Sequence, residues 1–243
     1  MTSQHVTKET LRRIISDITE IINSPLHDNG IYYEHDSENI LKGYILIIPS
    51  TDSPYKYGNY FFSLEFPTNY PYAPPKMKYL TNNGHTRFHP NFYRNGKVCL
   101  SLLNTWRGDK WTSCNTLSSI LLHVATLFTK DPLLHEPGIT ESHDSFHYYT
   151  DVIEYQNYST AIYHVLNNKI LLAENFSKDM IEHFMKIVKD KYKENKNDIL
   201  DSLTDKMNKH KFKISVEIQL YKMNEIIDYN EIYLKLKEYN ASL

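Results

Sequence analysis

The sequence contains two cysteines, Cys99 and Cys114, among its 243 residues. So few cysteines exclude a disulfide-stapled scaffold, and a zinc finger needs more ligands than these two thiols provide. Glycine is also scarce, with seven residues, and none of them forms the glycine-rich motif that cradles a nucleotide phosphate. The sequence therefore gives no sign of a disulfide-rich module, a zinc finger or a phosphate-binding loop.

The sequence also lacks a strong net charge and any long hydrophobic run. Its formal net charge is −2, with 41% hydrophobic and 23% charged residues, which is typical of a soluble globular protein. The near-neutral charge gives no electrostatic case for a nucleic-acid partner. The lack of a long hydrophobic run gives no case for a membrane partner. Residues 1–13 lack an apolar signal core. We therefore expect a cytoplasmic or nuclear location, where thiols stay reduced. The many Asn, Lys and Ile residues are typical of an AT-rich genome, and the location is the host cytoplasm if that genome is viral.

Hydrophobic periodicity divides the chain into a first helix, a β-rich section and a mainly helical remainder. Strand-like runs are separated by Gly, Asn, Asp and Pro, which predicts antiparallel strands joined by turns. The expected strands cover residues 31–33, 40–48, 60–66 and 76–80. The expected helices cover residues 8–23, 115–129, 151–174, 177–203 and 228–239, with a polar linker before residue 150 and one further strand within residues 212–220.

The chain is long enough for a core domain with an appendage. We expect a core domain over residues 1–175 and a C-terminal extension over residues 176–243 packed on it. The apolar faces in the extension need burial, so a buttress for the core is the default interpretation. A partner-binding surface is the alternative.

One stretch combines a rigid polar turn with a cysteine. The tripeptide His89-Pro90-Asn91 precedes Cys99 by eight positions, counted from Asn91. Proline fixes φ, and the intervening Asn95-Gly96 tolerates positive φ, so the stretch should be irregular but well fixed. A cysteine taken alone is more often a buried structural residue. A side-chain amide held beside it suits a thiol nucleophile, whose sulfur we expect to be exposed next to the turn.

This stretch resembles the active-site segment of ubiquitin-conjugating enzymes, in which His-Pro-Asn precedes the catalytic cysteine. The resemblance is dense from about residue 8 to about residue 140, and it includes residues 70–75, Trp111 and residues 131–137. Residues 92–101 are similar to those of the large members that carry a C-terminal helical extension. The resemblance implies an α+β fold, with a four-stranded antiparallel meander flanked by helices and a mainly helical extension.

The resemblance also implies an activity and its residues. Cys99 would accept ubiquitin from an activating enzyme as a thioester and pass it to a substrate lysine, usually with a ligase. Asn91 is the implied oxyanion donor, with bracing of the turn as its other role. His89 is implied to brace the loop, with general-base catalysis as the alternative. Glu136 would assist the attacking amine unless it is only a solvated loop acid, and Ser101 stands where many relatives carry aspartate. No cofactor and no metal are implied.

The resemblance finally implies surfaces for the activating enzyme and the ligases. Arg12 and Arg13 on the first helix, Tyr72 in the proline-rich loop, and Ser113 and Cys114 after Trp111 are the implied contacts. A solvated face or ordinary packing is the alternative for each. Two other functions stay open, namely conjugation of another ubiquitin-like modifier and non-catalytic ubiquitin binding, and the presence of the cysteine argues against the second.

Overall fold

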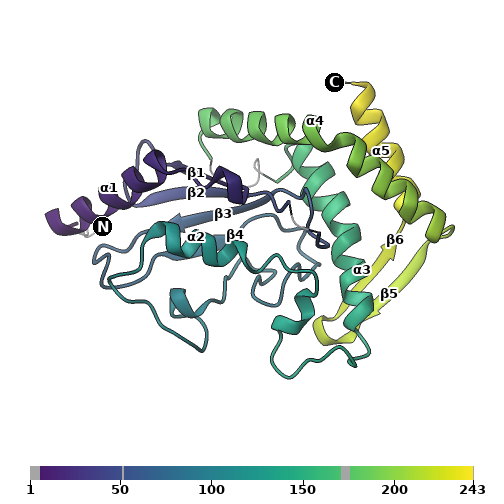
Figure 1. The fold of residues 1–243 in the computed structure, drawn as a ribbon, viewed down its shortest axis with the longest axis horizontal. Helices are drawn as coiled ribbons and strands as arrows, with labels where there is room; N and C mark the ends of the chain where they lie inside the picture. Colours follow the sequence, from purple (N-terminus) through teal and green to yellow (C-terminus); the bar gives the residue numbers. More distant parts are fainter. Residues whose placement is uncertain (1–5, 51, 171–175, 243) are drawn as a thin grey trace.

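The structure of the protein is a computed structural model that describes residues 6–50, 52–170 and 176–242. A four-stranded sheet lies beside two helices, and α3 stands between this sheet and a second, two-stranded sheet (Figure 1). The α-helices are α1 (Lys8–Asn23), α2 (Leu117–Ala125), α3 (Phe146–Gln156), α4 (Lys178–Lys209) and α5 (Tyr229–Ala241). The strands are β1 (Ile31–His35), β2 (Lys42–Ile47), β3 (Tyr60–Glu65), β4 (Lys76–Tyr79), β5 (Ile214–Ile218) and β6 (Met223–Ile227). Shorter helical turns are η1 (His27–Asn29), η2 (Ser101–Leu103), η3 (Pro132–His135), the π-helix η4 (Asn157–His164) and η6 (Gln219–Tyr221).

The main sheet is an antiparallel meander in the order β1-β2-β3-β4. Its register places Ile45 of β2 opposite Phe62 of β3, and Phe62 opposite Tyr79 of β4. All three side chains are buried, because large apolar residues on one face of neighbouring strands pack across the ladder. The four predicted strands are confirmed, with ends that shift by one or two residues.

The first helix begins and ends where local chemistry predicts. Thr7 caps α1 by accepting a hydrogen bond from the Thr10 N–H at 3.1 Å, and Ser24 follows its last residue. Ile14 and Ile21 lie on its buried face, which packs toward α2. The predicted helix over residues 8–23 is therefore confirmed.

The helix predicted over residues 151–174 begins earlier, at Phe146, so the expected polar linker is wrong in its last turn. Phe146 and Tyr149 are buried, which stabilises this extra turn. The helix then widens into η4, where both the main-chain N–H and the side-chain Nδ2 of Asn59 donate to the Ala161 carbonyl at 2.9 Å. Capture of this carbonyl from outside the helix accounts for the π-helical turn. Residues 171–174 of the predicted helix lie outside the described residues.

The C-terminal part of the chain contains a β-hairpin between two helices. The strand expected within residues 212–220 is confirmed as β5, and β6 was missed. The buried side of β6 carries Glu225 between Met223 and Ile227, and this inward acid breaks the alternating apolar pattern. The α+β class and the mainly helical extension are confirmed. No helix in the described ranges combines the length and apolar character needed to cross a bilayer.

The extension packs on the main sheet through aromatic side chains. Phe184 of α4 is fully buried, and its ring centroid lies 5.5 Å from that of Phe61 in β3. The ring centroid of Phe176 lies 4.5 Å from that of Tyr44 in β2, so one continuous core joins the sheet to α4. The domain boundary at residues 175/176 stays a prediction.

Candidate functional site

Asn91 and Cys99 are joined by two hydrogen bonds. The Cys99 N–H donates to the Asn91 carbonyl at 2.9 Å, and the Asn91 side-chain Nδ2 donates to the Cys99 carbonyl at 2.6 Å. Isolated bridges of His89 with Phe92 and of Phe92 with Val98 fix the chain between them. The structure therefore holds the amide beside the cysteine, as the turn chemistry predicts.

His89 braces this turn from inside. Its side chain is fully buried, and Nδ1 accepts a hydrogen bond from the Asn91 N–H at 3.0 Å, so the hydrogen of the neutral ring lies on Nε2. Burial lowers the pKa of His89 well below its usual value, and the neighbouring His135 and Arg87 lower it further. An interaction with the main chain of Leu127 raises the pKa again by a smaller amount. Among the described residues, Nε2 has no partner at regular hydrogen-bond geometry. An enclosed, neutral ring with Nδ1 engaged favours the bracing role over general-base catalysis.

The buried His89 makes stability depend on pH. In the unfolded chain this ring takes up a proton as the pH falls through about 6.5, whereas the folded protein keeps it neutral. The unfolded state therefore binds more protons below this pH, and the free energy of unfolding falls by up to about 1.4 kcal/mol per pH unit until the folded-state pKa is reached. Burial also lowers the pKa values of His35, His135 and His164, so we expect His89→Asn to lose only the His89 share of the slope. His147→Asn, which alters an exposed histidine, should keep the full slope. Urea unfolding across this range measures both, and a wild-type slope in His89→Asn would contradict the assignment.

Cys99 itself is only 1% exposed, so the expectation of an exposed sulfur is wrong for this conformation. The loop that follows is hydrogen-bonded to the main chain on both sides of this residue. The hydroxyl of Thr105 donates to the Val98 carbonyl and accepts from the Leu100 N–H, both at 2.9 Å, which places this residue across the cysteine segment. Asn91, directly beside Cys99, is 9% exposed. The cysteine is therefore buried in this conformation, and a partner reaches its sulfur only after neighbouring residues move.

This burial predicts the order in which the two thiols react. Cys114 is exposed and Cys99 is buried, and a buried thiol is inert compared with an accessible one. We expect iodoacetamide to modify Cys114 at least about tenfold faster than Cys99, and Thr105→Ala to accelerate modification of Cys99. Peptide mapping by mass spectrometry distinguishes the two sites, with Cys114→Ser as the variant that isolates Cys99. Equal rates in the wild-type protein would contradict a covered cysteine.

The acidic loop, residues 131–138, lies next to the His-Pro-Asn turn. The ring centroid of His135, at the end of η3, lies 4.8 Å from that of His89. Glu136 follows, half-buried, and its Oε2 accepts a hydrogen bond from the Tyr221 hydroxyl. Glu136 is therefore held by a residue of the C-terminal extension and is not simply a solvated acid.

Ser101 begins the short helix η2, two residues after the cysteine. Its carbonyl accepts a hydrogen bond from the Asn104 N–H at 2.8 Å, and its side chain is half-buried. Gly108 approaches it closely, since a Cβ there would lie 3.2 Å from the Ser101 Cβ, and the Gly108 φ of +119° disfavours other residues. Ser101 thus packs against the part of the loop that contains Gly108.

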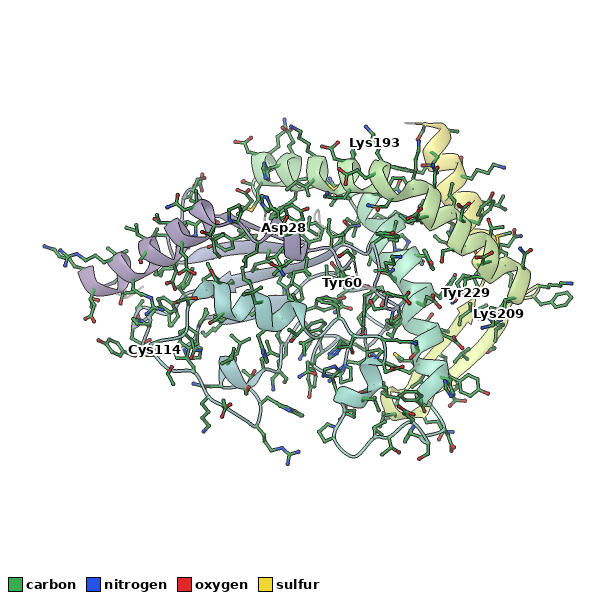
Figure 2. The ribbon with its side chains drawn as sticks, in the orientation of Figure 1. Asp28, Tyr60, Cys114, Lys193, Lys209 and Tyr229 are labelled. Carbon is green, nitrogen blue, oxygen red and sulfur yellow. The ribbon has the colours of Figure 1, made fainter. Side chains whose placement is uncertain are left out.

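The predicted partner-binding residues come from three segments that the structure brings together at one end of the molecule. Tyr72 is 67% exposed, and its hydroxyl donates to Glu9 of α1 at 2.6 Å. Arg12 is exposed on the same helix. Ser113 and Cys114 are exposed in the loop before α2, and Figure 2 shows Cys114 on this side, far from the two-stranded sheet.

Arg13 differs from the expectation, because its charge is used inside the molecule. Its Nε lies 3.0 Å from Asp17 Oδ1, and its two terminal nitrogens donate to the carbonyls of Ser113 and Asn115 at 2.6 and 2.5 Å. Arg13 therefore shapes the loop that carries Ser113, and Arg12 is the exposed member of the pair.

Sequence reasoning missed Arg87, which clamps the turn. Its guanidinium donates to the carbonyls of His89 and Pro90 at 3.1 and 2.6 Å, and it lies 3.3 Å from the ring centroid of Tyr93. An arginine two residues before a turn carries no sequence signal for this role. Among the described residues, no group of three His, Cys, Asp or Glu side chains could hold a metal ion.

Comparisons with known proteins agree with this geometry. The family profile described as ubiquitin-conjugating enzyme matches residues 13–162. Among similar proteins, ubiquitin-conjugating enzyme E2 Z of Xenopus tropicalis is 34% identical over 187 residues, which is 75% of this chain and 59% of that protein. The human E2 Z is 34% identical over 181 residues, covering 73% of this chain and 50% of that protein. Probable ubiquitin-conjugating enzyme protein 17 of Caenorhabditis elegans is 41% identical over 145 residues, covering 56% of this chain and 20% of that protein. The matched region thus spans little more than half the length of the E2 Z proteins.

Proposed function

Because the chain belongs to the ubiquitin-conjugating enzyme family, we propose that it carries ubiquitin as a thioester on Cys99 and transfers it to a substrate lysine. The observation that carries this proposal is the pair of hydrogen bonds that join Asn91 to Cys99 within the family's sequence motif. The family match does not favour the alternatives of another modifier or a non-catalytic variant.

The first step loads the enzyme. The Cys99 thiolate attacks the carbonyl carbon of the thioester between ubiquitin and its activating enzyme. The new carbon–sulfur bond forms, the old one breaks, and the thiolate of the activating enzyme leaves. One thioester replaces another, so the step is close to thermoneutral and needs no nucleotide here. ATP is consumed by the activating enzyme, which makes the pathway ATP-dependent.

The second step forms an isopeptide bond. The neutral amine of a lysine attacks the thioester carbon, the carbonyl oxygen gains negative charge, and the Cys99 thiolate leaves as the bond to sulfur breaks. A free lysine has a pKa of about 10.4, so the amine must lose a proton to react near neutral pH. The Glu136 carboxylate is the acceptor that we assign to this proton.

Asn91 stabilises the charged oxygen. Its side-chain NH2 group has two hydrogens, of which one is donated to the Cys99 carbonyl. We assign the second hydrogen to the oxyanion, where a preorganised donor is worth about 3 kcal/mol. The first hydrogen bond fixes the amide so that the second needs no reorganisation, and the bracing and catalytic roles are thus combined.

The partner-binding surface lies at one end of the molecule. We assign the activating enzyme and the ligase to the surface formed by Arg12, Tyr72, Ser113 and Cys114, with Arg13 behind it. We place the reaction in the cytoplasm or the nucleus, where a reactive thiol stays reduced.

A charging assay tests the proposal. The full chain is incubated with ubiquitin-activating enzyme, ATP and fluorescent ubiquitin, and the products are separated with and without reductant. We expect an adduct that depends on ATP and disappears with reductant. No adduct would contradict the proposal, and an adduct only with another ubiquitin-like modifier and its activating enzyme would reassign the modifier.

A further inference from the structure

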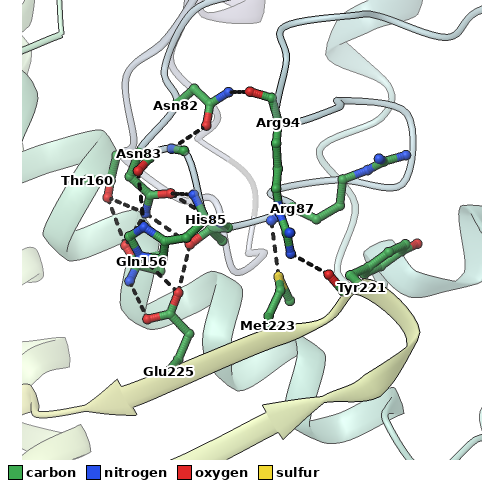
Figure 3. A network of polar contacts seen from close by, with 12 residues as sticks. Asn82, Asn83, His85, Arg87, Arg94, Gln156, Thr160, Tyr221, Met223 and Glu225 are labelled. Carbon is green, nitrogen blue, oxygen red and sulfur yellow. Dashed lines mark hydrogen bonds and ion pairs between the residues drawn. The ribbon is translucent and has the colours of Figure 1, made fainter.

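Tyr221, in the turn between β5 and β6, contacts three segments that lie beside the His-Pro-Asn turn or lead from it to Cys99. These segments are the residues before the His-Pro-Asn turn, the loop between Asn91 and Cys99, and the acidic loop that contains Glu136. Figure 3 shows how the hairpin carries Tyr221 and its neighbours against the first two segments. The extension therefore does more than cover the core.

The first two contacts involve arginines. The Tyr221 carbonyl accepts a hydrogen bond from Arg94 Nη2 at 2.5 Å, and Arg94 belongs to the loop that leads to Cys99. The Arg87 guanidinium lies 5.3 Å from the centroid of the Tyr221 ring while it holds the carbonyls of His89 and Pro90. The main chain and ring of Tyr221 are thus tied to both sides of the turn.

The third contact is the hydrogen bond between the Tyr221 hydroxyl and Glu136. Burial raises the pKa of Tyr221, and Tyr149 and the Glu136 carboxylate raise it further, so the hydroxyl keeps its hydrogen and acts as the donor. One such bond to Oε2 fixes the orientation of the carboxylate, which retains acceptor capacity on its other oxygen. Glu136 is therefore oriented before any lysine arrives.

The hairpin that carries Tyr221 is itself anchored to the segment before the turn. Glu225 of β6 is 7% exposed, and its carboxylate accepts from Thr86 Oγ1 and Gln156 Nε2, both at 2.9 Å. Met223 Sδ accepts from the Arg87 N–H at 3.1 Å. Because inward residues of β6 bind the core in this way, the position of Tyr221 is set by several contacts besides its own.

We propose that Tyr221 is a positioning residue for discharge, which acts by holding the Glu136 carboxylate in place for the attacking lysine amine. The C-terminal extension thereby contributes to the second step of the reaction. This inference rests on the proposed function, because it needs a thioester on Cys99 to discharge. It predicts that the hydroxyl of Tyr221 matters for transfer to lysine and not for loading.

The test is a double-mutant cycle in single-turnover discharge. Wild type, Tyr221→Phe, Glu136→Ala and the double variant are charged with ubiquitin, ATP is removed, and loss of the thioester is followed at increasing free lysine. Tyr57→Phe is the matched control, because its hydroxyl also joins the core to a carboxylate of the extension, Asp198 on α4, at 3.0 Å. Thermal unfolding of each protein shows that it is folded at the assay temperature.

We expect Tyr221→Phe to charge like wild type and to lower the maximal discharge rate about tenfold, as for loss of one hydrogen bond to a charged group. In the Glu136→Ala background the same change should have no further effect, because the group that it positions is gone. Tyr57→Phe should discharge like wild type. An unchanged rate in Tyr221→Phe, or an equal loss with and without Glu136, would overturn the inference while normal charging upholds the proposed function. Absence of any wild-type thioester would instead overturn the proposed function.

Discussion

Replacing Cys99 by alanine is expected to abolish the ubiquitin adduct, the largest effect that any single change should have on this protein. The Cys99 sulfur is the only atom of this protein that forms a covalent bond to ubiquitin in the proposed reaction. Loss of the nucleophile leaves no route to a thioester, whereas loss of a neighbouring group only slows it. The measurement is the charging assay with fluorescent ubiquitin, read without reductant. An ATP-dependent adduct on Cys99→Ala would contradict the assignment of the carrier residue.

Cys99→Ser separates loss of the nucleophile from loss of the fold. Serine is close in size to cysteine and keeps a nucleophilic atom, so any adduct becomes an oxygen ester that survives reductant. Cys114→Ser is the control, because it removes the exposed thiol and should leave the reductant-sensitive adduct unchanged. A loss of the adduct in Cys114→Ser would move the carrier to that residue.

Asn91→Ala is expected to have the second largest effect, on discharge. Loss of an oxyanion donor lowers the rate of acyl transfer about 10²–10³-fold. The change also leaves the buried Cys99 carbonyl without its 2.6 Å partner, which should lower the free energy of unfolding by about 1–3 kcal/mol. Single-turnover discharge to free lysine and urea unfolding measure these two effects separately.

The outcome of Asn91→Ala distinguishes the catalytic role of Asn91 from its bracing role. Loading should proceed if the protein is folded, since an intact thiol is all that the first step requires from this residue pair. If a folded Asn91→Ala fails to load, the amide acts chiefly by holding the segment, and the oxyanion assignment is wrong. If it loads and discharges like wild type, the oxyanion role is wrong, and if its free energy of unfolding is also unchanged, the bracing role is wrong too.

Features that depend on neighbours along the chain could be predicted from the residues alone. The first helix, the four strands of the meander and β5 follow from periodicity and from caps such as Thr7, because the same few residues decide both the pattern and the backbone. The pairing of Asn91 with Cys99 was also predictable, since Pro90 restricts the chain just before Asn91 and an Asn-Gly turn lies within the eight positions that follow.

Which distant groups meet at the site depends on how the whole chain packs. The hydrogen bonds from Arg13 to the carbonyls of Ser113 and Asn115, 100 and 102 residues away, and the bond from Tyr221 to Glu136, 85 residues apart, join segments whose sequences give no sign of the contact. Strand β6 belongs to the same class, because its inward Glu225 is stable only where Thr86 and Gln156 meet it. Local pattern sets the elements, but the exposure of a sulfur and the partner of a carboxylate depend on how those elements pack.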